Sequence, residues 1–265
     1  MSSLPHTPEA TPADPWADLR RHTPARIALG RAGTSLPTAE LLRFAAAHAQ
    51  ARDAVHVPLD VPALTAALLV EGWTPLTVQS RAPHRDAYLR RPDWGRRLDP
   101  ASADALQAAG NGSRGPVDLA LVLGDGLSAV ALQRHALPVL TALRDALAGA
   151  MTWAPLVIAT QARVALGDEI GALLQARLVL VLLGERPGLS SPDSLGAYLT
   201  HAPQLGCHDA QRNCVSNIRP EGLPPAAAAQ RLAWLLRAAL RRRTSGIALK
   251  DDSATALLDH RTPAP

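Results

Sequence analysis

Three continuous apolar runs constrain the fold of this chain more than any other feature. The runs are "VDLALVL" (117–123), "APLVIAT" (154–160) and "LVLVLL" (178–183). Strands that lack an apolar–polar alternation are typical of a sheet that is covered on both faces. The segments between the runs, 127–148 and 168–176, are predicted to be amphipathic helices. Because strand and helix alternate with short joints, the order predicts a parallel sheet with right-handed crossovers.

Three regions are expected along the chain. Residues 1–15 are rich in Pro, Thr and Ala without apolar periodicity, which predicts a disordered tail. Residues 16–100 are predicted to form a smaller, helical N-terminal region. Residues 101–265 are predicted to form an α/β domain with a parallel, Rossmann-like, three-layer sheet.

Three helices are predicted outside the strand-rich part or at its end. The first spans 38–53, with Thr38 as its N-cap and Leu41, Leu42, Ala45 and Ala49 on one face. The second spans 61–72 and is closed by its glycine. The third spans 224–243, begins with prolines and is suited to cover one face of the sheet.

Composition excludes several classes of partner. The 47% hydrophobic and 19% charged residues are globular values, and the net charge of +4 is too small and too mixed to indicate a nucleic-acid partner. Cys207 and Cys214 are spaced C-x6-C, which fits no zinc signature. The N-terminus shows no secretory signal, and no apolar run reaches about 18 residues. We therefore expect a soluble cytosolic protein without a membrane partner.

Two glycine-rich loops leave the predicted strands. Gly124–Ser128 follows the first strand and Gly184–Gly188 follows the third, and each carries a carboxylate, Asp125 or Glu185. In an open parallel sheet, ligands bind at the carboxyl ends of the strands. If the strands are parallel, both loops lie on one edge, which is the candidate ligand site.

The chemistry of single residues leaves several readings open at this edge. The pattern Gly124-x-Gly126-x-x-Ala129 matches a dinucleotide fingerprint, but Asp125 places a negative charge where a pyrophosphate needs donors. Glu185 fits a loop-capping group as well as a ligand contact, and Cys214 alone is expected to be a small buried side chain. A nicotinamide-dependent oxidoreductase using Gly124–Ala129 and a non-catalytic interaction domain both remain alternatives.

Six motifs, taken together and in order, resemble a known family. They are "RRHTPARIALGRAG" (20–33), "YLRRPDWGRRL" (88–98), "GDGLS" (124–128), "GDEIGALL" (167–174), "LLGERPGL" (182–189) and "CVSNIRPEG" (214–222). In this combination the chain resembles the small (light) subunit of ethanolamine ammonia-lyase over residues 17–250.

The resemblance implies a function and a set of contacts. It implies adenosylcobalamin-dependent, radical conversion of ethanolamine to acetaldehyde and ammonia by a hetero-oligomer, in the cytoplasm or within a bacterial microcompartment. A barrel-shaped large subunit is expected to hold the substrate and the catalytic residues, so that this chain is inactive alone. This chain is expected to cover the cobalamin, which carries the cobalt, at the subunit interface. The implied cofactor contacts are Val164, Glu185 and Cys214.

Overall fold

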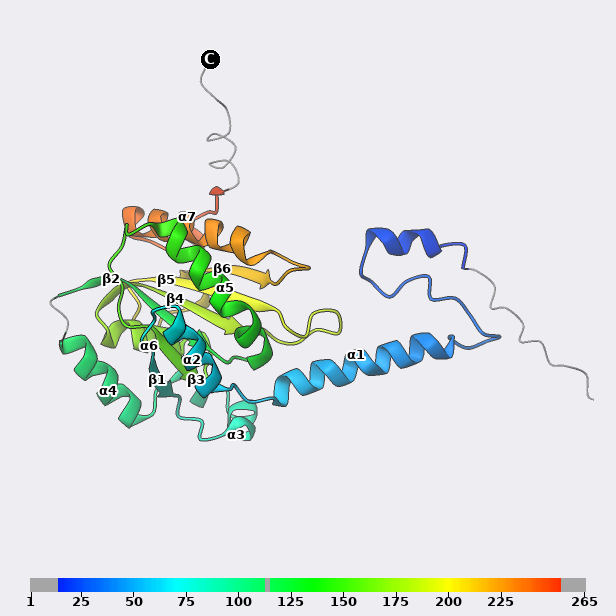
Figure 1. The fold of residues 1–265 in the computed structure, drawn as a ribbon, viewed down its shortest axis with the longest axis horizontal. Helices are drawn as coiled ribbons and strands as arrows, with labels where there is room; N and C mark the ends of the chain where they lie inside the picture. The colour runs from blue at the N-terminus through cyan, green and yellow to red at the C-terminus, as the bar shows by residue number, and fades with distance from the viewer. Residues whose placement is uncertain (1–13, 113–114, 254–265) are drawn as a thin grey trace, which may run out of the picture.

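A six-stranded sheet lies at the centre of the computed structural model, which describes residues 14–112 and 115–253 (Figure 1). The strand order is β1-β3-β2-β4-β5-β6. The neighbours β1, β3, β2 and β4 are parallel, whereas β5 is antiparallel to β4 and β6 is antiparallel to β5. The strands are β1 (Leu76–Gln79), β2 (Val117–Gly124), β3 (Val157–Thr160), β4 (Ala176–Gly184), β5 (Leu195–His201) and β6 (Arg212–Ile218).

The central strands are buried on both faces, as their continuous apolar runs predict. In β4, Leu180 packs into one core cluster, and its neighbours Val179 and Val181 pack into the other. This follows from the period of two along a strand, which sends successive side chains to opposite faces. Two apolar faces require a helical layer on each side.

The helices supply these two layers. On one face lie α5 (Ala129–Leu147) and α7 (Pro225–Arg242), with α2 (Val61–Val70) against α5. On the other face lie α4 (Pro100–Asn111) and α6 (Leu166–Leu173). The short α3 (Arg85–Arg90) follows β1. Short 3-10 helices are at Ala17–His22, Trp94–Arg96, Asp209–Gln211 and Gly246–Ala248.

The second helical layer leaves one side of β6 open. α6 packs over β2 and β4, and α4 packs against β1 and α6. Beyond them, Cys214 and Ser216 of β6 stay exposed on this face, while Val215 between them is buried in the core on the other face. The sheet therefore ends in an antiparallel pair that is fully covered on one face only.

The prediction of a parallel sheet is confirmed for β2, β3 and β4 but is wrong for the sheet as a whole. The sequence analysis misses β5 and β6 because "LGAYLTH" and "RNCVSNI" mix polar with apolar residues, as strands do when one face is open. It also misses β1, which lies within the region predicted to be helical and pairs with β3. The predicted tail falls largely on residues 1–13, outside the described residues.

Residues 14–57, here called the arm, extend away from the sheet (Figure 1). The arm contains α1 (Thr38–His56), in which only Ala54 is buried. The predicted apolar face of this helix does not pack on the sheet, because Leu41 is 53% and Leu42 is 66% exposed. Among the described residues, no single helix is long and apolar enough to span a membrane; α1 and α2 satisfy that test together but are bent by 80° at the break between them.

Candidate functional site

The loops after β2 and β4 meet at one edge of the sheet, as the sequence predicts. The backbone N–H of Leu127 donates to the carbonyl of Gly184 over 2.8 Å. A Cβ atom on Gly126 would lie 2.1 Å from the carbonyl oxygen of Gly184, and one on Gly184 would lie 2.0 Å from that of Ser128. Only glycine at both positions permits this approach. The glycines that match a dinucleotide fingerprint are thus used to pack two loops together.

Asp125 ties these loops to the end of β3. Its side chain is buried, and its two oxygens accept hydrogen bonds from the backbone N–H groups of Gln161 and Ala162, each over 2.9 Å. Arg85 lies 3.5 Å from the same carboxylate and donates to the carbonyl of Gly126 over 2.7 Å. The carboxylate of Asp125 is therefore used within the fold, where it connects the loop after β2 to the end of β3.

An open pocket of about 440 Å³ lies at this edge. Its lining comes from α3, from the segments that follow β2 and β3, from the end of β4 and the loop after it, and from β5 and β6. The lining residues are Tyr88, Leu127, Arg163, Val164, Leu183, Gly184, Glu185, Arg186, Tyr198 and Ser216. The structure thus brings Val164 and Glu185, two of the three residues implied as cofactor contacts, to one pocket. Cys214 does not line it, but it is the cross-strand neighbour of Tyr198, which does.

Glu185 is bound within the chain by three donors. The hydroxyl of Ser194 and the backbone N–H of Asn217 donate to one carboxylate oxygen, and the hydroxyl of Ser216 donates to the other over 2.6 Å. A carboxylate offers about four acceptor positions. Glu185 therefore fastens the loop after β4 to β6 and retains acceptor capacity toward the pocket. The two interpretations of Glu185 that the sequence leaves open, a loop-capping group and a ligand contact, are therefore compatible with each other.

Cys214 is exposed, so the expectation of a small buried side chain is wrong. It lies on the open side of β6, next but one to Ser216, and among the described residues neither α4 nor α6 makes an extensive contact with β6. Neighbouring atoms nevertheless desolvate the sulfur, and together with the negative charge of Glu185 this raises the pKa of the thiol. Burial also raises the pKa of the Tyr198 phenol. Both groups therefore stay protonated at neutral pH.

Sequence reasoning misses Tyr88, Arg163, Tyr198 and Ser216. Tyr88 is fully buried, donates to the carbonyl of Ala162 over 3.0 Å, and lies between the guanidinium groups of Arg85 and Arg163. One signal is present in the sequence: residues 161–165 leave β3, the third parallel strand, at the same edge as the two glycine loops. Tyr198 and Ser216 follow only from the antiparallel strands.

Comparison with known proteins gives the family. The model of the family "Ethanolamine ammonia-lyase light chain" matches residues 13–250. The chain belongs to this family. It is 55% identical over 245 residues to the ethanolamine ammonia-lyase small subunit of Pseudomonas syringae pv. tomato, which covers 92% of this chain and 85% of the relative.

Other members of the light-chain family match over nearly their whole length. The ethanolamine ammonia-lyase small subunit of Azotobacter vinelandii is 56% identical over 247 residues, 93% of this chain and 92% of the relative. That of Xanthomonas campestris is 56% identical over 254 residues, 95% of this chain and 93% of the relative. The resemblance inferred from six short motifs is thereby confirmed.

Proposed function

We propose that this chain is the small subunit of an adenosylcobalamin-dependent ethanolamine ammonia-lyase that converts ethanolamine to acetaldehyde and ammonia. In this proposal the chain covers the cobalamin at the interface with a large subunit, which holds the substrate and the catalytic residues. The observation that carries the proposal is that Val164 and Glu185 meet at one open pocket, with Cys214 on the adjoining uncovered face, in a member of the light-chain family.

The residues of the pocket fit the rim of a corrin ring. Bound adenosylcobalamin would supply the radical chemistry, and the carboxamides on its rim offer both N–H donors and carbonyl acceptors. Val164, Leu127 and Leu183 offer apolar contact, and the remaining acceptor position of Glu185 suits a carboxamide N–H. The thiol of Cys214 stays protonated and suits a carboxamide carbonyl as a weak donor.

The size of the pocket supports a shared site. A pocket of about 440 Å³ that opens on an uncovered face is too small to enclose a corrin ring with its two axial groups. The partner must then supply the remaining walls, so we expect the chain alone to bind cobalamin weakly and to be inactive.

Two uncovered surfaces beside this pocket are suited to contact a large subunit. One is the open side of β6, and the other is the arm, where large apolar side chains are exposed. The arm is also in contact with the loop after β4, since Arg26 donates to the carbonyl of Leu189 over 3.3 Å. Large exposed apolar surfaces mark interaction sites in soluble proteins.

The experiment is a titration of adenosylcobalamin into this chain, the large subunit and their mixture, with turnover of ethanolamine as a second readout. We expect tight binding and turnover only in the mixture. Tight binding by this chain alone would contradict the shared site, and a mixture that assembles without binding cobalamin would leave only an interaction role.

Variants of Glu185 test its place in the site. Replacing Glu185 with Ala removes a charge-assisted acceptor, so we expect the cofactor to bind the complex about 5- to 150-fold more weakly, corresponding to about 1–3 kcal/mol. Ser194→Ala is the matched control, because it breaks one hydrogen bond of the same loop but keeps the carboxylate. Equal losses in both variants would mean that Glu185 acts only by fastening the loop.

A further inference from the structure

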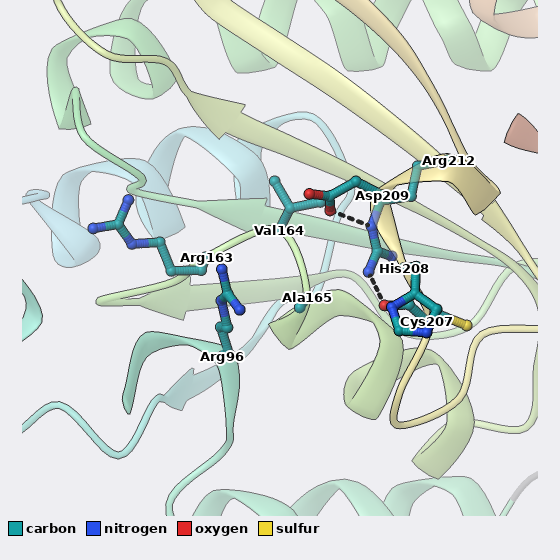
Figure 2. Close-up of a pocket in the computed structure, with 8 residues that line it drawn as sticks. All are labelled: Arg96, Arg163, Val164, Ala165, Cys207, His208, Asp209 and Arg212. Atoms are coloured by element: carbon teal, nitrogen blue, oxygen red, sulfur yellow. Dashed lines mark hydrogen bonds and ion pairs between the residues drawn. The ribbon is translucent and has the colours of Figure 1, made fainter. Parts of the chain in front are cut away.

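A second, smaller pocket adjoins the first. It has a volume of about 250 Å³ and shares Arg163 and Val164 with the larger pocket (Figure 2). Arg96 and Arg163 lie on one side of it, and Cys207, His208, Asp209 and Arg212 lie on the other. Arg163 and Val164 therefore lie between two neighbouring pockets.

On the side of the pocket formed by residues 207–212, the charged groups are paired within the chain. Arg212 is buried and donates to Asp168 over 2.6 Å and to the carbonyl of Cys207 over 2.7 Å. Asp209 lies 3.4 Å from the same guanidinium. The ring of His208 caps the 3-10 helix that follows it. None of these groups needs a further partner of opposite charge.

Arg96 and Arg163, on the opposite side of this pocket, lack such partners in the described structure. Within the part of the chain that the structure describes, neither Arg96 nor Arg163 makes an ion pair or a side-chain hydrogen bond, and the buried Nε of Arg163 lacks a partner. Arg163 is only partly exposed and is held by its position 4.4 Å from the centre of the Tyr88 ring. A guanidinium carries five donors, and a partly buried one is normally hydrogen-bonded.

Other arginines at the same edge show what Arg163 lacks. Arg85 donates to two carbonyl groups, those of Val55 and Gly126, and Arg97 forms a two-pronged pair with Glu169. Each of these guanidinium groups has at least two of its donors paired within the fold, although Nη2 of Arg85 is also buried without a partner among the residues described. Arg163 is fixed by stacking and by its backbone bond to Gly95, yet no acceptor among residues 14–112 and 115–253 meets its side chain. This arrangement suits an anion that arrives with a ligand.

We propose that Arg163, with Arg96 as a second cation, binds the phosphodiester of the cobalamin nucleotide tail. The inference rests on the proposed function, because it requires the corrin ring to lie at the larger pocket. Cobalamin carries a single anionic group, the phosphodiester, and its rim carboxamides are neutral. A planar guanidinium binds a phosphate through two parallel N–H donors. Since Arg163 lines both pockets, it lies where a tail would pass from one to the other.

The test compares two ligands that differ in the phosphate alone. Adenosylcobinamide and adenosylcobinamide phosphate share the corrin ring and lack the base, and each is titrated into the complex of this chain with its large subunit. We expect the phosphate to improve affinity for the unmodified complex at least about tenfold, as for a hydrogen bond to a charged group. In the Arg163→Gln complex this gain disappears, while binding of adenosylcobinamide is unchanged. Arg163→Lys keeps the positive charge but lacks the two parallel N–H donors, so we expect it to retain part of the gain in affinity from the phosphate.

Arg241→Gln is the matched control. It removes one positive charge from the end of α7, on the other face of the sheet, and should keep the full gain. The proposal is overturned if Arg163→Gln keeps the gain, if it weakens both ligands equally, or if it blocks assembly of the subunits in gel filtration. The last outcome would indicate that Arg163 pairs with a carboxylate of the large subunit instead of with the phosphodiester. Failure of the unmodified complex to bind either corrinoid would instead contradict the proposed function.

Discussion

The arm and the sheet are built from the same apolar residue types, but they use them differently. In the sheet, leucines and valines of β2 and β4 are buried between two helical layers. In the arm, large apolar side chains are exposed: Trp16, Leu19, Ile27, Leu36, Leu41, Leu42, Phe44 and Val57. The comparison teaches that the sheet carries its own core, whereas the arm has apolar surface without a core of its own.

The helix of the arm shows why this is possible. α1 is rich in Ala, the residue with the highest helix propensity, which favours a helix even where few side chains pack. Its salt bridges join side chains near the surface, such as Arg43 with Glu40. Most of the stability of a helix in a protein comes from packing of one face, and α1 buries only Ala54. We therefore expect the arm of the isolated chain to contribute little to the free energy of unfolding.

A pair of Leu→Ala variants, one in the core of the sheet and one in the arm, should show the largest difference in the free energy of unfolding. Leu140 of α5 is fully buried, so Leu140→Ala should lower the free energy of unfolding by about 2–5 kcal/mol. Leu42→Ala in the arm, at 66% exposure, should change it by less than about 0.5 kcal/mol. Urea unfolding of the isolated chain measures both. A large loss from Leu42→Ala would show that the arm belongs to the cooperative unit.

A pair of Gly→Ala variants sharpens the comparison with a smaller effect. Gly126 and Gly33 both have positive φ angles, 56° and 64°, so each substitution carries a similar backbone strain. A Cβ atom at Gly126 would also meet the backbone of Gly184, whereas at Gly33 it meets nothing within 4 Å. We expect Gly126→Ala to cost about 1–3 kcal/mol more than Gly33→Ala. Thermal unfolding of both variants measures the difference, and equal costs would mean that the two loops can move apart.

The smallest expected effect depends on pH. Burial alone would raise the pKa of Asp118, but hydrogen bonds from Thr152 and the ion pair with Arg177 hold it below its usual value. A carboxylate with a lowered pKa stabilises the fold above its unfolded pKa of about 3.9, and this contribution is lost as the pH falls through the lowered folded value.

Asp118→Asn should therefore lower the free energy of unfolding by no more than about 1 kcal/mol at pH 6, with a smaller difference near pH 3. Asp53→Asn is the control in the arm, where the exposed pair with Arg52 should contribute nothing measurable. Urea unfolding at the two pH values measures both. A difference that stays constant or grows toward pH 3 would contradict the assignment of this carboxylate.

The sequence predicts the elements whose pattern of apolar residues matches their burial in the fold. β2, β3, β4, α5 and α7 were found because their strands are continuous apolar runs and their helices have one apolar face. The edge formed by Gly126 and Gly184 also followed, since parallel strands end on the same side. β5 and β6 were missed because their open face takes polar residues, and β1 was missed because four residues give too short a pattern.

By itself, the sequence determined the family, the central parallel strands and the edge where their loops meet, because these depend on local patterns and short motifs. Only the tertiary structure decided what the edge contains. It placed Tyr198 and Cys214 beside Glu185 through antiparallel pairing, and it left Arg163 stacked on Tyr88 with its buried Nε unpaired among the described residues. Such contacts join residues far apart in the chain, and no local pattern of apolar and polar residues records which of them will meet.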